Sequence, residues 1–195
     1  GLAMSGKIVY VYSIIPFVTM RCFEQIRLDL AYNNANVKLV GVGAGFTYGS
    51  MGSSHHAIED ISIMRSIPNM TVFCPGDPFE TEELIKRSYE HFGPVYIRLG
   101  KNGEPIIHKN KNKIEIGEII SLTEGDDLIL ITTSNTLELG KSWVDDWSQE
   151  GVHVNLVSVP TIKPINQSMI RKLIDRNIPM ITLEEHSIIG GLGST

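Results

Sequence analysis

The segment from Gly41 to His56, GVGAGFTYGSMGSSHH, is rich in residue types suited to ligand chemistry, with five glycines and a closing pair of histidines. Glycines let a backbone adopt positive φ angles and approach a ligand closely. His55 and His56 stand where a helix is expected to begin, and a helix N-terminus favours neutral imidazoles, which can donate to or accept from a substrate oxygen. The histidines could instead be merely exposed beside a helix cap made by Ser53 or Ser54.

Common nucleotide and metal motifs do not fit this chain. No Gly-Lys-Ser/Thr follows the glycines, which excludes a P-loop, and neither Gly43 nor Gly45 has the further glycine that a dinucleotide fingerprint requires. No His, Cys, Asp or Glu spacing is typical of a metal site, so no metal ligand is predicted. Cys22 and Cys74 stand among apolar residues, and we expect both to be reduced core thiols.

Two further charged positions stand at the ends of apolar runs. Arg98 lies near the carboxyl end of residues 95–99, where a guanidinium could bind a phosphate or carboxylate, or could form a structural salt bridge. Glu184-Glu185-His186 closes a later run, just before Gly190-Gly191-Leu192-Gly193. Paired carboxylates can do acid–base work, but such a cluster more often makes structural hydrogen bonds or a subunit contact.

Apolar runs of strand length alternate with amphipathic stretches of helix length, and these elements must position the residues named above. Strands are predicted over residues 7–14, 38–44, 71–74, 94–99, 127–133, 152–159 and 179–183. Helices are predicted over residues 18–32, 56–66, 79–91, 137–149 and 167–176. Strands separated by helices imply right-handed crossovers and parallel sheets.

The polar, basic segment 100–113 interrupts this alternation and divides the chain. We therefore predict an α/β fold class with two three-layer α/β domains and mainly parallel sheets. The first domain would cover residues 1–104 and the second residues 118–195, joined by a linker over residues 105–117.

Composition narrows the function classes. The 195 residues are 42% apolar and 20% charged, which is ordinary globular material, and 17 basic against 22 acidic residues leave a net charge of −5. That balance argues against a nucleic-acid or anionic-membrane partner, since both need clustered Lys and Arg. No apolar run reaches the roughly 18 residues of a membrane helix, so we expect a cytoplasmic protein. Because the chain opens at Gly1 without an initiator Met, we expect it to be part of something longer.

Several motifs, in consistent order along nearly the whole chain, resemble transketolase-like thiamine diphosphate enzymes. The pyrimidine-binding domain of that family is matched by GSMGSSHHAIED at 49–60, MRSIPNM at 64–70 and CPGD at 74–77. The family's carboxyl-terminal domain is matched by TIKP at 161–164 and EEHSIIGGLG at 184–193. The resemblance is closest to the C-terminal subunits of split transketolases, with 1-deoxyxylulose-5-phosphate synthase a close relative.

The resemblance implies an enzyme that transfers a two-carbon ketol unit between sugar or sugar-phosphate substrates, with thiamine diphosphate as cofactor. In this family the pyrimidine domain of one protomer meets the diphosphate domain of another, so we expect a homodimer or a heterotetramer with a diphosphate-binding subunit. Mg²⁺ would be held by that partner domain, which is absent from this chain, and activity would depend on joining it.

The resemblance also assigns roles to residues. His55 would be catalytic, facing the reacting carbonyl group, while His56 and Arg98 would bind the substrate, Arg98 through its sugar phosphate. Phe17 would bind the cofactor by stacking on its aminopyrimidine ring, unless it is simply a core residue. The glutamate that activates the cofactor would lie about nine residues before Gly1.

Two departures from the family pattern bear on the substrate. Transketolase has a His-Asp pair where this chain has Gly43-Ala44, and an Asp where it has Met51. Both changes remove polar contacts to a sugar, so we expect a modified sugar or another ketol donor. Two alternatives stay open: the β-subunit of a 2-oxoacid dehydrogenase, and a subunit without cofactor chemistry that serves in assembly or regulation.

Overall fold

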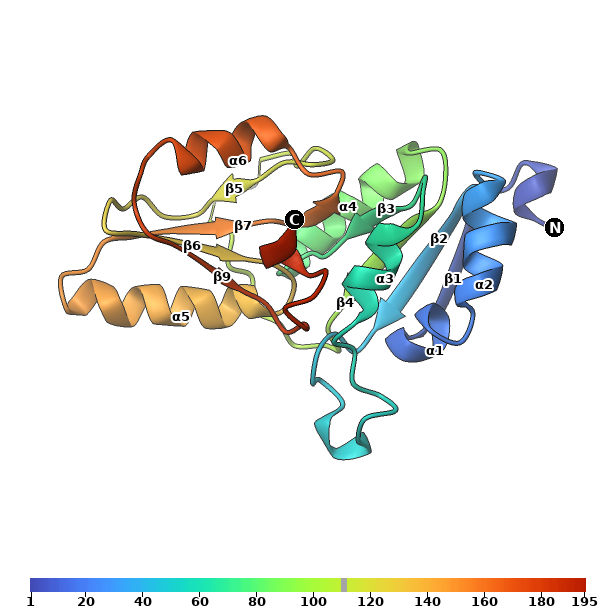
Figure 1. Cartoon of the computed structure of the whole chain (residues 1–195), viewed down its shortest axis with the longest axis horizontal. Helices are drawn as coiled ribbons and strands as arrows, with labels where there is room; N and C mark the ends of the chain where they lie inside the picture. Colours follow the sequence, from blue (N-terminus) through green and yellow to red (C-terminus); the bar gives the residue numbers. More distant parts are fainter. Residues whose placement is uncertain (110–111) are drawn as a thin grey trace.

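The computed structural model describes residues 1–109 and 112–195, which form two adjoining α/β units, each built around its own sheet (Figure 1). The first unit contains β1 (Val9–Ile14), α1 (Ile15–Thr19), α2 (Phe23–Gln25), β2 (Val37–Val42), α3 (Asp60–Ser66), β3 (Thr71–Phe73), α4 (Pro78–Glu90) and β4 (Val95–Leu99). The second contains β5 (Ile120–Ser121), β6 (Leu128–Thr132), α5 (Thr136–Gln149), β7 (Val154–Ser158), β8 (Thr161–Lys163), α6 (Gln167–Ile174) and β9 (Met180–Leu183). Short helical turns cover Ala3–Ser5, Gly49–Met51 and Leu192–Ser194.

The first sheet has the strand order β1-β2-β4-β3-β8, and its first four strands are parallel. Its inner strands are buried on both faces and rich in Val and Ile, as parallel sheets require. Helices α1 and α3 cover one face, while α4 packs Phe79 and Leu84 against Phe73 and Ile97 on the other. Asp77 caps α4 by accepting a hydrogen bond from the backbone N–H of Glu80.

The second sheet has the order β5-β7-β6-β9, in which β7, β6 and β9 are parallel and β5 is antiparallel. Helix α5 packs Leu137 and Val144 on one face, and Met169 and Ile170 of α6 pack toward the other. The predicted fold class, two α/β domains with mainly parallel sheets, is therefore confirmed. No helix among the described residues is long and apolar enough to cross a membrane.

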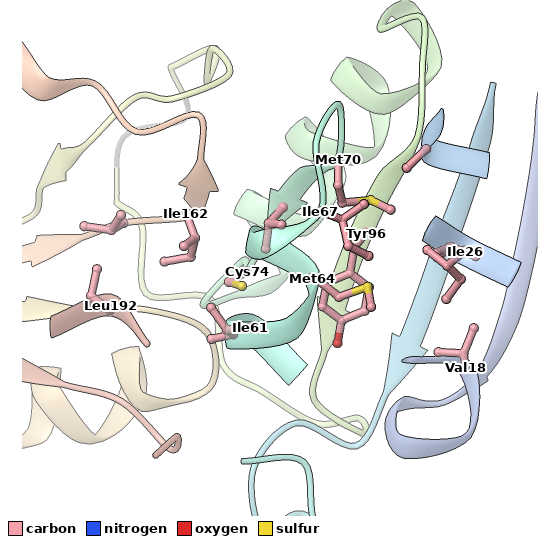
Figure 2. Close-up of a cluster of buried hydrophobic side chains, with 14 of the residues drawn as sticks. Val18, Ile26, Ile61, Met64, Ile67, Met70, Cys74, Tyr96, Ile162 and Leu192 are labelled. Carbon is pink, nitrogen blue, oxygen red and sulfur yellow. The ribbon is translucent and has the colours of Figure 1, made fainter. Parts of the chain in front are cut away.

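Strand β8 links the two units, because it follows β7 in the chain but pairs antiparallel with β3 in the first sheet. Lys163, at its end, donates from Nζ to the carbonyls of Arg65 and Ile67 at the end of α3. The largest buried cluster continues across this junction: Figure 2 shows Ile162 and Leu192 of the second unit facing Ile61 and Cys74 of the first. The two units therefore share one hydrophobic core.

The structure corrects several local predictions. The helix expected over residues 18–32 is instead α1, α2 and a π-helical segment, Ile26–Tyr32; Pro16 starts α1 early because its fixed φ suits a first helical turn. The second helix begins at Asp60 rather than His56, so both histidines stay in the preceding loop. Cys22 is exposed, whereas Cys74 is buried and burial raises the pKa of its thiol. Strands β5 and β8 were not predicted, and the predicted linker includes Asn110 and Lys111, which lie outside the described residues.

A buried ion pair joins α3 to β4 beneath the shared core. Arg98 Nε lies 2.9 Å from Asp60 Oδ2, and Tyr96 Oη donates to the same oxygen over 2.6 Å. Burial and the Asp60 carboxylate raise the pKa of Tyr96, which keeps the phenol protonated as a donor. Arg98 also donates to Ser134 Oγ in the second unit, so this pair spans both units.

A second buried cluster fixes the segment that leads from the first unit to the second. Asp77 Oδ2 accepts from His108 Nδ1 over 2.9 Å, while Glu80 accepts from Ser158 Oγ over 2.6 Å. Burial opposes the ionisation of Asp77, but hydrogen bonds from His108 and backbone N–H groups lower its pKa to about 2. Burial raises the pKa of Glu80 to about 7. Burial also disfavours His108 protonation, yet Asp77 and Glu80 leave its pKa raised.

Replacing Arg98 by Met should lower the free energy of unfolding by about 3–5 kcal/mol, because Asp60 is left as an unpaired buried charge. Urea denaturation followed by circular dichroism measures this loss. The double variant Arg98→Met with Asp60→Asn should regain part of the stability, since no buried charge then remains. A loss below about 1 kcal/mol for Arg98→Met would contradict a stabilising buried pair.

The contribution of Glu80 to stability should fall as the pH rises from 4.5 to 7.5, because folded Glu80 keeps a proton that the unfolded chain, with the ordinary pKa of 4.5, has lost, whereas His91, whose pKa burial lowers, acts oppositely. The Glu80 contribution is complete below pH 4.5 and lost through about pH 7. The raised pKa of His108 acts in the same direction, whereas Asp77 acts oppositely, and only below its ordinary pKa of 3.8. Glu80→Gln should flatten this fall by on the order of 2 kcal/mol in urea titrations at each pH. Equal slopes for both proteins would show that Glu80 does not titrate in this range.

Candidate functional site

A loop between β2 and α3 carries the glycines and histidines singled out from the sequence, and it projects from the body of the first unit (Figure 1). Its base is closed by reciprocal backbone hydrogen bonds between Gly45 and Ala57, of 3.1 and 2.9 Å. Gly43, with φ of 92°, lies under the ring of Tyr48, and a Cβ there would sit 2.2 Å from Tyr48 Cε2. Only glycine at position 43 therefore lets the tyrosine fold back onto the end of β2.

Aromatic and imidazole rings from the loop and from α1 pack in two groups, one around His55 and one around His56. The Phe17 and His55 ring centroids are 5.0 Å apart in a T-shaped arrangement, and Tyr48 meets His55 at 6.1 Å. His56 packs on Phe46, with centroids 5.0 Å apart. We call these five residues the aromatic cluster. The structure thus brings Phe17 and His55 together, as separate parts of the sequence had suggested, whereas His56 pairs with Phe46.

Two cations flank the aromatic cluster. The Arg21 guanidinium lies 4.1 Å from the Phe17 ring centroid, and Lys101 Nζ lies 5.7 Å from that of Tyr48. Within residues 1–109 and 112–195, neither side chain is within ion-pair distance of a carboxylate. An anionic group beside the rings would therefore find positive charge on two sides.

Sequence reasoning missed Arg21, Tyr48 and Lys101. Arg21 stands four residues after Phe17, a spacing that places two residues on one helical face, so this neighbour could have been found. Lys101 lies in the polar, basic segment 100–113, and nothing local marks it as a neighbour of Tyr48. Their proximity depends on β2 and β4 being adjacent in the sheet.

Arg98 does not face the aromatic cluster. Its side chain is buried, and besides Asp60 it donates through Nη1 to Ser134 and Asn135 and through Nη2 to the carbonyls of Ala57 and Glu185. All five N–H groups of a guanidinium are thereby matched with protein acceptors. Of the two interpretations from the sequence, this geometry supports the structural salt bridge, and it leaves no donor for a substrate phosphate.

A cavity of about 370 Å³ opens at the carboxyl ends of β2 and β4, where its lining includes Val42, Leu99, Lys101 and Asn135. Ligands of open α/β sheets bind at this edge. Because Lys101 also contacts Tyr48, the cavity and the aromatic cluster adjoin each other.

The residues present fit one part of the expected cofactor. The half-buried ring of Phe17, with imidazole beside it and the Arg21 guanidinium over it, is an aromatic ring of the kind on which an aminopyrimidine can stack. In the part of the chain that the structure describes, no group of three or more His, Cys, Asp or Glu side chains is placed to hold a metal ion.

Comparison with known proteins identifies both units. Residues 1–104 match the family described as transketolase, pyrimidine binding domain, and residues 117–195 match transketolase, C-terminal domain. An apulose-4-phosphate transketolase subunit of Actinobacillus succinogenes is 36% identical over 194 residues, covering 100% of this chain and 62% of that protein. A 6-deoxy-6-sulfo-D-fructose transketolase subunit of a Clostridium species is 33% identical, covering 100% of this chain and 60% of that protein.

A solved structure described as a split gene transketolase, inactive beta4 tetramer, superposes with a TM-score of 0.88 at 35% identity. The match covers 100% of this chain and 63% of that one, so the chain spans about three fifths of the relatives it matches. The resemblance inferred from the motifs is confirmed, and the chain belongs to the transketolase family, of which it carries the pyrimidine-binding and C-terminal domains.

Proposed function

We propose that this chain forms one side of the active site of a thiamine diphosphate-dependent enzyme that transfers a two-carbon ketol unit between sugar substrates. The observation that carries the proposal is the aromatic cluster, Phe17, Phe46, Tyr48, His55 and His56, flanked by Arg21 and Lys101 at the carboxyl edge of the sheet. A cofactor ring requires a flat ring for stacking, and a sugar carbonyl requires an imidazole as a hydrogen-bond partner. A phosphate requires exposed cations.

In this proposal each residue of the chain has a separate task. Phe17 holds the cofactor's aminopyrimidine ring by stacking. His55 hydrogen-bonds the oxygen of the reacting carbonyl, and its Nδ1, 3.0 Å from Ser54 Oγ, is held in place from behind. His56, 3.3 Å from the Gly49 carbonyl through Nε2, contacts the substrate hydroxyls. Thiamine diphosphate, when bound, would supply a nucleophilic carbon for the ketose carbonyl that His55 holds.

The other side of the site is assigned to a partner. The proposal places Mg²⁺ and the diphosphate on a diphosphate-binding subunit that packs against the projecting loop. Phe46 and Met51 of this loop are 51% and 59% exposed, apolar surface that such a contact would cover. Two relatives are themselves described as transketolase subunits, and the split gene transketolase structure is described as inactive in its beta4 form. Those descriptions support an enzyme assembled from two chains.

Tyr48 supports a substrate other than an ordinary pentose phosphate. Its ring fills the space above Gly43, where transketolases carry a histidine side chain, and it therefore replaces an imidazole with a phenol beside His55. The relatives named after apulose 4-phosphate and 6-deoxy-6-sulfo-D-fructose act, by their names, on modified sugars. We assign this chain a modified ketose with a phosphate or sulfonate terminus as its donor.

Mixing the chain with its diphosphate-binding subunit, thiamine diphosphate and Mg²⁺ tests the proposal. Ketol transfer from a modified ketose phosphate to an aldose phosphate, detected by mass spectrometry, is the expected result, with either subunit alone inactive. Decarboxylation of a 2-oxoacid with a lipoyl acceptor, without ketol transfer, would instead favour the dehydrogenase interpretation. Cofactor binding by the mixture with neither reaction would favour an assembly role.

His55→Ala should lower kcat of the assembled enzyme on the order of 10²-fold, because the hydrogen bond to the carbonyl oxygen strengthens as negative charge develops there. Steady-state kinetics and cofactor titration are the measurements, and thiamine diphosphate affinity should stay unchanged. His153→Ala, at an exposed histidine of the second unit, is the control. If cofactor affinity is lost while kcat is preserved, His55 contacts the cofactor and not the substrate.

Lys101→Met should raise KM for the phosphorylated donor by about five- to tenfold, because an exposed cation–phosphate contact is lost from ground-state binding. KM for the same sugar without its phosphate should not change. Lys172→Met, at an exposed lysine of α6, controls for the loss of one positive charge. An equal rise for both sugars would show that Lys101 does not contact the phosphate.

A further inference from the structure

The second unit contributes none of the five residues of the aromatic cluster, yet a short segment of it reaches the base of the loop that carries four of them. This segment, residues 184–187, follows β9, and we call it the C-terminal clasp. We propose that Glu185 of the C-terminal clasp is a positioning residue that holds the loop in its working conformation. The inference deepens the proposed function and rests on it where it concerns catalysis.

The carboxylate of Glu185 binds the segment that enters the loop. Its Oε2 accepts hydrogen bonds from the backbone N–H of Phe46, at 3.3 Å, and from Asn135 Nδ2, at 2.6 Å. Gly45 lies directly beneath, with φ of 59°, and a Cβ added there would meet Glu185 Oε2 at 2.0 Å. Because position 45 is a glycine, the carboxylate can reach the loop backbone, which a side chain there would block.

The main chain and the His186 side chain of the C-terminal clasp hold the segment that leaves the loop and the first turn of α3. Ser187 donates its N–H to the carbonyl of Ile58 over 2.8 Å, and the N–H of Ser62 points to His186 Nε2 at 3.3 Å. Arg98 Nη2 lies 3.0 Å from both the Ala57 and the Glu185 carbonyls, which ties the two segments together. Both sides of the loop base are thus attached to the second unit.

The contact at Phe46 transmits this attachment to the site. Phe46 packs on His56, and Tyr48, two residues on, packs on both His55 and the backbone of Gly43. A charge-assisted hydrogen bond to the Phe46 N–H therefore fixes where these rings stand. Because catalytic groups must be held within a fraction of an ångström, loosening the loop should slow turnover more than it weakens cofactor binding, whose stacking residue, Phe17, lies outside the loop.

Hydrogen–deuterium exchange on the full chain tests the attachment without any activity assay. Glu185→Ala should make the amides of residues 45–57 exchange about tenfold faster, because the Phe46 N–H loses its acceptor. Glu185→Gln, which keeps an acceptor oxygen, should restore most of the protection. Glu184→Ala is the matched control, since Glu184 accepts from the N–H groups of Leu192 and Gly193 and not from the loop. Exchange of α4 amides should be equal in all proteins, which shows that the fold is intact.

The kinetic test uses the enzyme assembled with its diphosphate-binding subunit. Glu185→Ala should lower kcat about tenfold with thiamine diphosphate affinity within about twofold of the wild type, and Glu185→Gln should recover most of kcat. Unchanged loop exchange in Glu185→Ala, or the same faster exchange in Glu184→Ala, would overturn the proposal. If the wild-type assembly transfers no ketol unit, the proposed function fails, while the exchange measurement still decides whether Glu185 holds the loop.

Discussion

The guanidinium of Arg98 lies where three segments distant in sequence converge, and it offers each of them a donor in a fixed direction. Asp60 in α3, Ala57 at the end of the loop, Ser134 before α5 and the Glu185 carbonyl after β9 all accept from it. A buried charge is tolerated only when its partners are all in place, so these segments have one mutual arrangement in which Arg98 is satisfied. The position of the loop, and therefore of the site, depends on the hydrogen bonds that Arg98 must make.

The features that follow from local pattern could be predicted from the sequence. Apolar runs separated by amphipathic stretches give parallel strands and crossover helices, and the structure has both. The loop could be predicted from its glycines, which are followed by His55 and His56. Glycines give the backbone conformational freedom, and two histidines beside them indicate a ligand site. Phe17 was predicted as a site residue from the family resemblance alone. No spacing rule connects a residue of α1 to a loop that follows the next strand.

Features that depend on contacts between distant segments could not be predicted. Strand β8 has three residues, and its pairing with β3 places it in the sheet of the other unit, which no local alternation encodes. Lys38 is fully buried within β2, where Nζ donates to the carbonyls of His91 and Gly93 and burial lowers its pKa to about 8. A lysine in a strand pattern ordinarily indicates a solvated face. Its burial could not be predicted, because the carbonyls that accept from it come from a distant segment.

The placement of β8 also limits where a gene for this fold could be divided. A break between the two units would leave β3 as a bare sheet edge, with unpaired N–H and C=O groups and apolar side chains open to other chains. Such a fragment would be prone to aggregation, and its missing piece would have to add a strand before anything else could assemble. Gene fission and domain exchange within this architecture are therefore expected to keep the two α/β units together. Any division would fall outside the two units and not between them.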